Sequence, residues 1–363
     1  MDWSRGRILG HGSSATVSLA SSCRSDLVFA VKSSELSRSL FLQREQSILS
    51  TVSSPYIVAY KGCDVTRENN KLFYNLFMEY MPFGNILQAV QRHGGHLDLG
   101  FVGCYTWQIL QGLEYLHSNG LVHCDIKSTN VLIGEDGAKI SDFGCAKRVD
   151  DTAAPTSGTP MFMAPEVARG EEQGCAGDIW ALGCTVMEMA SGISPWPNAA
   201  EPYSVLHRIA CSGERPEIPG LLPEEAKDFL DKCLKRNPKE RWTATQLLNH
   251  PFVTEFNSKS AVNEIQKLNS SSPTCVLEQG FWNSMEESET HGILIRTKFE
   301  NTAADRIKRL AEFSGEPRWT RDDNWITIRG TDEASASISD DGLEESVTSN
   351  VRSRISGCFS RNY

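Results

Sequence analysis

The stretch of residues 121–133, LVHCDIKSTNVLI, constrains the fold most strongly, because it places a short polar loop between two apolar runs. Apolar strands on both sides would hold such a loop in place. It then fixes a carboxylate (Asp125), an ammonium group (Lys127) and an amide (Asn130) in one small pocket. These groups suit phosphoryl transfer, in which a carboxylate accepts the proton of an attacking hydroxyl, a cation offsets the developing phosphate charge and an amide oxygen binds a metal ion. The alternative is a surface loop with ordinary charges.

Composition excludes several classes of protein. With 363 residues the chain is long enough for two lobes, or for a domain and a tail. A net charge of −10 argues against a nucleic-acid binder, which normally has a basic face. The eleven cysteines have no CxxC spacing, and no apolar run approaches the ~20 residues that cross a bilayer. We therefore expect an intracellular protein of a reducing compartment, cytoplasmic and/or nuclear, with no membrane or nucleic-acid partner.

The first 32 residues predict three strands: two in a hairpin, and a third that ends at Lys32. Gly10 and Gly12 lie in the hairpin, where their missing side chains allow backbone amides to approach a polyanion. Ala15 stands where a third glycine would be usual. A dinucleotide-binding fold also uses glycines, but there a helix follows them and an acidic residue comes about 20 positions later. Here a strand follows and position 32 is a lysine.

Residues 34–52 have the composition of a helix whose three-and-four spacing puts apolar residues and Glu45 on one face. A carboxylate on an apolar stripe needs a partner, since burying it unpaired is costly. Lys32 is the natural candidate, and the alternative is a partly exposed helix charge. Residues 71–80 then read as a central strand of the sheet.

From residue 86 the pattern changes to helices, and residues 101–118 predict a long buried helix that leads into the polar loop. After the loop, Asp142 is followed by Phe143 and Gly144, one hairpin away from Asn130. This position suits a carboxylate that shares a metal ion with Asn130. A metal site at His117, His123 and Cys124 is not favoured, because the spacing matches no standard ligand set.

Taken together, these motifs resemble the eukaryotic protein kinases. They are GxGxxAxV from Gly10, AVK at Lys32, HCDIKSTN from His123, DFG at Asp142, APE from Ala164 and DIWALG from Asp178. The resemblance covers residues 3–253. It implies an α+β, two-lobed kinase fold: a small antiparallel β-sheet lobe with one regulatory helix (3–81), and a larger, mainly helical lobe (82–253). A tail, largely disordered, would follow at 254–363.

The resemblance also implies roles for individual residues. Asp125 would receive the substrate proton and Lys127 would neutralise the transferring phosphate, while Asn130 and Asp142 would hold Mg²⁺. Glu166 would pair with Arg241, and Asp178 would anchor the backbone of the loop. The residues implied to bind ATP are Leu9, Gly10, Gly12, Val17, Ala30, Lys32, Glu45, Met78, Glu79, Met81 and Leu132.

Two features resemble serine/threonine kinases: the position of Lys127 two residues after Asp125, and the sequence Gly158-Thr159-Pro160 before APE. The stretches GTPMFMAPEV, DFGCAK and HCDIKSTNVLI resemble MEKK-like MAP kinase kinase kinases, particularly a small plant subgroup with an N-terminal kinase domain. The expected partners are MAP kinase kinases, phosphorylated in a stress or hormone signalling cascade. The alternatives are a Ste20-type upstream kinase or a pseudokinase scaffold that acts through binding alone.

One departure from the family concerns regulation. Most kinases have an arginine before the catalytic aspartate, where it binds a phosphate on the activation segment, and this chain has Cys124 there. A thiol cannot form that charge-assisted hydrogen bond. We expect activity to depend only weakly on phosphorylation between Asp142 and Glu166, although Thr152, Thr156 and Ser157 are available. The alternative is that Lys147 or Arg148 replaces the missing arginine.

The tail beyond residue 253 is rich in Ser, Asn, Thr and Glu, which is typical of disorder. Residues 296–330 differ, because an amphipathic stretch precedes the aromatic segment RWTRDDNWITIRG. We expect an ordered island there that makes docking or autoinhibitory contacts. The alternative is an unstructured tether.

Overall fold

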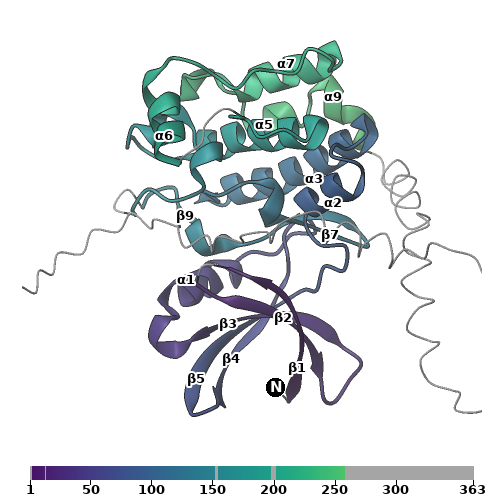
Figure 1. Cartoon of the computed structure of the whole chain (residues 1–363), viewed down its shortest axis with the longest axis vertical. Coiled ribbons are helices and arrows are strands. Elements are labelled where there is room, and N and C mark those ends of the chain that lie inside the picture. The colour runs from purple at the N-terminus through teal and green to yellow at the C-terminus, as the bar shows by residue number, and fades with distance from the viewer. Residues whose placement is uncertain (1, 13, 152–153, 198–201, 258–363) are drawn as a thin grey trace, which may run out of the picture. The chain divides into compact units, whose positions relative to one another are not determined.

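The computed structural model describes residues 2–12, 14–151, 154–197 and 202–257, which form a β-sheet lobe followed by a helical lobe (Figure 1). The two-lobed α+β kinase architecture expected from the sequence is thereby confirmed. The expected island at 296–330 and its docking contacts lie outside the described residues.

The N-terminal lobe is a five-stranded antiparallel sheet with the strand order β1-β2-β3-β5-β4. One face of the sheet has its own small core, in which the ring of Phe77 meets those of Trp3 and Phe29 edge to face, each at a centroid distance of 5.3 Å. As the sequence predicted, β5, the second strand after the regulatory helix, lies inside the sheet, between β3 and β4. The strands are β1 (Trp3–His11), β2 (Thr16–Ser22), β3 (Val28–Glu35), β4 (Tyr60–Glu68) and β5 (Lys71–Met78).

The regulatory helix α1 (Leu40–Leu49) begins six residues later than the predicted start at residue 34, and it ends before the predicted end. The reason is that β3 continues to Glu35, where Ser33, Ser34 and Glu35 still pair with β5. A short 3₁₀ turn (Leu36–Arg38) then separates strand from helix. The predicted inward face is correct within the helix, because Leu42, Glu45 and Leu49 are all buried.

The C-terminal lobe is built around two long helices, α3 (Leu99–Ser118) and α5 (Cys175–Ser191), of which α3 was predicted as a buried helix. No helix among the described residues is both long enough and apolar enough to span a bilayer. The remaining elements are α2 (Ile86–Arg92), β6 (Leu121–Val122), β7 (Val131–Gly134), β8 (Gly137–Ile140), β9 (Lys147–Arg148), α4 (Pro165–Ala168), α6 (Pro202–Cys211), α7 (Glu224–Cys233), α8 (Ala244–Leu247) and α9 (Pro251–Thr254), with 3₁₀ turns at Ser128–Asn130, Phe143–Cys145, Pro160–Phe162, Pro238–Glu240 and Glu255–Asn257.

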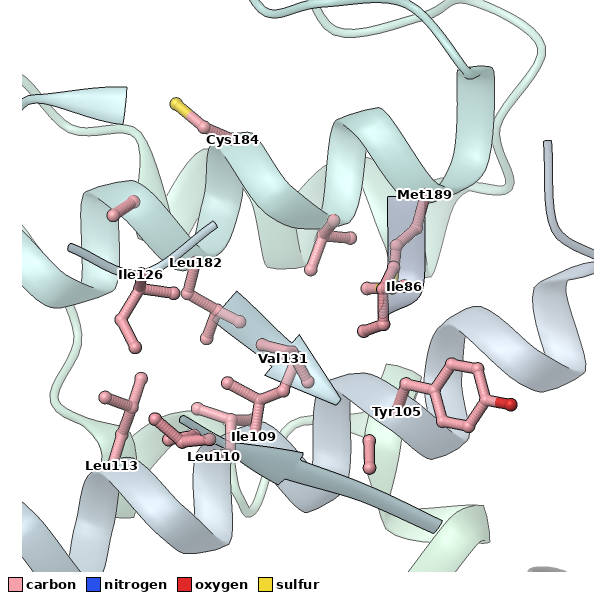
Figure 2. Packing of buried hydrophobic residues seen from close by; sticks show 14 of the residues in the cluster. Ile86, Tyr105, Ile109, Leu110, Leu113, Ile126, Val131, Leu182, Cys184 and Met189 are labelled. Atoms are coloured by element: carbon pink, nitrogen blue, oxygen red, sulfur yellow. The ribbon is translucent and has the colours of Figure 1, made fainter. Parts of the chain in front are cut away.

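The polar loop of residues 123–130 is held by the core between α3 and α5. Ile126 lies inside the loop and Val131 directly follows it, and both are completely buried. Figure 2 shows their side chains inserted among Ile109, Leu113 and Leu182 of the two long helices. Burying an aliphatic side chain contributes about 1.5–3 kcal/mol, so the packing that stabilises the lobe also fixes the position of the loop.

Backbone hydrogen bonds join the two lobes on both sides of the linker that follows β5. Ile140 N donates to Tyr56 O (2.9 Å), and Val58 N donates to Ile140 O (3.0 Å). On the linker itself, Ile133 N donates to Gly84 O (2.8 Å). These bonds tie β8 to the first lobe and β7 to the linker, and both strands border the polar loop.

The predicted pair of Glu166 and Arg241 is also present. Two parallel hydrogen bonds of 2.6 Å join the guanidinium group to the carboxylate, and both side chains are almost fully buried. The pair connects α4 to the segment that precedes α8, across 75 residues of sequence.

Candidate active site

The carboxylate of Asp125 is surrounded by hydrogen-bond donors from two separate segments. Lys127 Nζ lies 2.9 Å from Oδ2, and Asn130 Nδ2 donates to Oδ2 (2.9 Å) and to the backbone oxygen of Asp125 (2.9 Å). From the activation segment, Thr159 Oγ1 donates to Oδ1 (2.7 Å) and accepts from Lys127 Nζ (2.5 Å). The three residues predicted to form one small pocket are therefore in direct contact.

Asp178 at the start of α5 anchors the polar loop, as predicted. Its Oδ2 accepts the backbone N–H of His123 (2.9 Å), and its Oδ1 accepts that of Cys124 (2.8 Å). His117 Nε2 lies 2.9 Å from the same carboxylate. Burial alone would raise the pKa of Asp178, but the hydrogen bonds from His117 and the loop hold it below its usual value. The Asp178 carboxylate, whose lowered pKa favours the charged form, thus fixes the backbone just before Asp125.

Lys32 on β3 bridges two carboxylates. Its Nζ donates to Glu45 Oε2 (2.7 Å) and to Asp142 Oδ1 (3.0 Å), so Glu45 is buried and paired as the sequence predicted. Burial would lower the pKa of Lys32, but the two carboxylates outweigh it and hold the pKa above its usual value. For Glu45, burial is the larger effect and raises the pKa, although Lys32 opposes it. Lys32 therefore carries a firm positive charge near Asp142.

Asn130 and Asp142 are the predicted metal ligands, and Ser141, next to Asp142, donates its backbone N–H to Asn130 O (2.8 Å). Asp142 adopts a left-handed backbone conformation (φ 63°), an uncommon one for a residue other than glycine, and its side chain is about half exposed. Asn130 uses its Nδ2 to bind Asp125, which leaves its Oδ1 as the atom for a ligand. One carboxylate and one amide oxygen, completed by phosphate oxygens and water, suit a hard divalent cation such as Mg²⁺. The donor set therefore fits the predicted metal.

Gly10 and Gly12, which were predicted to approach the phosphates, lie in the hairpin of β1 and β2. Gly10 pairs with Val17, which pairs in turn with Lys32 on β3, so these three residues form a row across the sheet. A side chain at Gly10 would have no heavy atom within 4 Å. The backbone N–H of Gly12 donates to Ala15 O (2.8 Å) and closes the turn. The hairpin thus presents an open edge beside Lys32.

The predicted adenine-binding residues come from both lobes. Ala30 on β3 pairs with Met78, the last residue of β5, and Leu132 on β7 bridges to the linker at Asn85. The backbone N–H of Glu79 donates to Ala59 O (2.9 Å), so its carbonyl oxygen is the group left for an adenine base. Of the two remaining members of the predicted set, Met81 is buried and Leu9 on β1 is exposed.

Sequence reasoning missed two side chains at the site. Thr159 was read only as a sign of the serine/threonine class, although its hydroxyl joins Asp125 to Lys127. Gln173, from the loop before α5, contacts both the activation segment and the polar loop. The position of Thr159 just before APE was a usable signal for the first residue, whereas no local pattern marks the second.

Comparison with known proteins gives a consistent result. A family model described as protein kinase domain matches residues 3–253. Mitogen-activated protein kinase kinase kinase 17 of Arabidopsis thaliana is 57% identical over 293 residues, which cover 79% of this chain and 78% of that protein. Mitogen-activated protein kinase kinase kinase 18 of the same plant is 48% identical, over 91% of this chain and 99% of its own length. Mitogen-activated protein kinase kinase kinase 20 is 38% identical, over 91% of this chain and 100% of its own length.

Proposed function

This chain belongs to the protein kinase family, as an ATP-dependent serine/threonine kinase of the MAP kinase kinase kinase type, and we propose from this membership that its substrates are MAP kinase kinases. The names of the relatives, which cover most of this chain, support the substrate class. The observation that carries the chemistry is the contact of Thr159 with Asp125 and Lys127, because it sets an activation segment of the serine/threonine type against the proposed catalytic base.

We assign the steps of transfer to the residues of the polar loop. The carboxylate of Asp125 orients the substrate hydroxyl and accepts its proton as the oxygen attacks the γ-phosphorus of ATP. Lys127, which is already within 2.9 Å of that carboxylate, offsets the charge that develops on the transferring phosphoryl group. The departing ADP takes the electron pair of the broken phosphoanhydride bond. Most of the catalysis in this scheme is positioning and electrostatics.

ATP is held from both sides of the linker. Lys32, kept in place by Glu45, contacts the α- and β-phosphates, while the hairpin of Gly10 and Gly12 covers them. A divalent cation is required by the family in general, and we propose Mg²⁺ held by Asn130 and Asp142. The carboxylate of Asp142 and the amide oxygen of Asn130 would hold this ion, which would offset part of the negative charge of the phosphates.

Phosphorylation of a panel of purified MAP kinase kinases by the purified full-length chain tests the substrate class. The expected result is phosphate on serine or threonine in the activation segments of a subset of the panel. Transfer to a generic basic protein without any transfer to the panel would contradict this substrate class. Transfer to MAP kinase kinase kinases instead would favour the Ste20-type alternative, and no transfer at all would favour a scaffold.

We also propose that the protein acts in a reducing compartment, the cytoplasm, the nucleus or both. The support is that every cysteine of the described residues is a free thiol, including four that are buried.

A further inference from the structure

The activation segment needs an attachment that does not depend on phosphate. Cys124 occupies the position before Asp125, where its side chain is buried and its Sγ faces Val122 O at 3.8 Å. Burial, together with the nearby Asp178, raises the pKa of this thiol, so it stays neutral. A neutral, buried thiol offers no positive charge to a phosphorylated segment. In this structure, hydrogen bonds from other side chains hold the segment on the polar loop.

Gln173 makes three hydrogen bonds that link the segment to the polar loop. Its Oε1 accepts the backbone N–H of Ser157 (3.3 Å), and its Nε2 donates to the backbone oxygen of Ser157 (2.9 Å). The same Nε2 donates to the backbone oxygen of Cys124 (3.4 Å). The amide thus binds both polar groups of one activation-segment residue and the residue directly before Asp125. Because these partners are backbone atoms, the link does not depend on the chemistry of their side chains.

The chain geometry next to this link requires close contact. Gly158 has φ +121°, which strongly favours glycine, and a Cβ there would lie 2.4 Å from Cys124 O. The segment therefore lies directly on the polar loop at the residue between Ser157 and Thr159. Ser157 Oγ donates to Cys145 O (3.3 Å), which fixes the same residue from the other end of the segment.

Solvent has little access to these hydrogen bonds. Gln173 is 7% exposed, and its side chain borders a cavity of ≈ 10 Å³. That volume holds about one water molecule. If the amide were removed, bulk water could not replace all three hydrogen bonds, and buried backbone groups would be left unpaired. The segment would then lose both hydrogen bonds that hold the backbone of Ser157, two residues before Thr159.

We propose that Gln173 is a positioning residue, which holds the activation segment on the polar loop and so sets Thr159 against Asp125 without a phosphate group. This inference rests on the proposed kinase function and adds a regulatory feature to it. In this proposal Gln173 replaces the missing arginine in attaching the activation segment to the polar loop. Kinase activity is therefore expected to depend only weakly on phosphorylation of that segment.

The test compares phosphatase-treated full-length variants in transfer from ATP to a generic protein substrate. Gln173→Leu is expected to lower kcat about tenfold or more, because the segment is released, while the KM for ATP changes less than about twofold. The matched control is Gln108→Leu. Gln108 is also buried, and it accepts the backbone N–H of Ala138 (2.7 Å), away from the activation segment. This control is expected to lower the unfolding temperature but to keep kcat.

Gln173→Glu gives a second, isosteric test with a pH readout. An ionised carboxylate would face the oxygens of Ser157 and Cys124, whereas a protonated one restores an O–H donor. Burial and the carboxylates of Asp125 and Asp178 on the same cavity favour the protonated form, whereas Lys127 beside Asp125 and Lys147 near Cys124 oppose it. The Cys124 thiol is neutral. The activity of this variant relative to wild type is therefore expected to rise as the pH falls from 8 to 6.

Three outcomes are decisive. The positioning role would be overturned if Gln173→Leu kept the wild-type kcat. It would also be overturned if Gln173→Leu and Gln108→Leu lost kcat equally. A ratio of Gln173→Glu activity to wild-type activity that stays constant from pH 8 to pH 6 would also overturn it. Absence of transfer by the wild type itself would instead contradict the proposed function, so the two failures are distinguishable.

Discussion

Asp125 is defined by the donors that surround it more than by its own burial. Two of them, Lys127 and Asn130, come from the same loop, and the third, Thr159, comes from 34 residues away. The first two were predictable because the loop is short and braced by apolar runs. Thr159 and Gln173 were not assigned roles, since their contacts depend on how the activation segment folds back onto the loop.

The hydroxyl of Thr159 gives a prediction at this scale. Thr159→Val removes hydrogen bonds to a carboxylate and an ammonium group, each worth about 1.5–3 kcal/mol. We expect kcat to fall about tenfold to a hundredfold, measured as steady-state transfer to a protein substrate. Thr159→Ser keeps the hydroxyl and is the control, expected within about threefold of wild type. Equal activity of the Val and Ser variants would mean that the hydroxyl does not position Asp125.

At the scale of elements, propensity and periodicity predicted the strands and helices that carry the site but misplaced both ends of α1. The sequence pattern correctly identified the inward face of α1, on which Glu45 lies. It did not show that residues 33–35 remain in the sheet, because their pairing with β5 is a contact between strands 40 residues apart in sequence. Local pattern thus locates the face of α1, and tertiary pairing sets where the helix begins.

The pair of Glu166 and Arg241 gives a prediction for the stability of the helical lobe. Arg241→Ala leaves a buried carboxylate without its partner, which typically costs about 3–5 kcal/mol. We expect this loss in the free energy of unfolding, measured by urea denaturation of the full chain. Arg215→Ala is the control, because Arg215 pairs with Asp231 (2.6 Å) while about half exposed. Exposed pairs contribute about 0–1 kcal/mol, so similar losses in the two variants would contradict a structural role for the buried pair.

At the scale of the whole molecule, the site is assembled from both lobes. The sheet lobe supplies Lys32 from β3 and Glu45 from α1, the helical lobe supplies Asp125 and Asn130 from the polar loop, and Asp142, which follows β8, contacts Lys32. All five were expected from the sequence as a set, because six separate motifs occur in the order of one family. The contacts of Lys32 with Glu45 and Asp142, and of Asn130 with Asp125, are formed in this structure.

The arrangement predicts how the full-length protein responds to phosphatase. The side-chain amide of Gln173 binds backbone atoms of Ser157 and Cys124, and Gly158 lies against Cys124 O. Because these contacts hold the segment, protein stripped of phosphate is expected to keep at least about half of its activity. Mass spectrometry of residues 142–166 checks that phosphate has been removed, and a mock-treated sample is the control. Loss of nearly all activity would contradict this account and would favour the alternative in which Lys147 or Arg148 binds a phosphate.

The central claim, that the polar loop and its partners transfer phosphate, is tested most directly by radiolabelled transfer from ATP in two variants. Asp125→Asn removes the proton acceptor, and Lys32→Met removes the cation that contacts the phosphates. Each is expected to lower transfer to a generic substrate by about 10²- to 10⁴-fold. Asp125→Asn is expected to keep the wild-type unfolding temperature, whereas Lys32→Met leaves buried Glu45 unpaired and is expected to lower it. Transfer that persists near the wild-type rate in both variants would contradict the account.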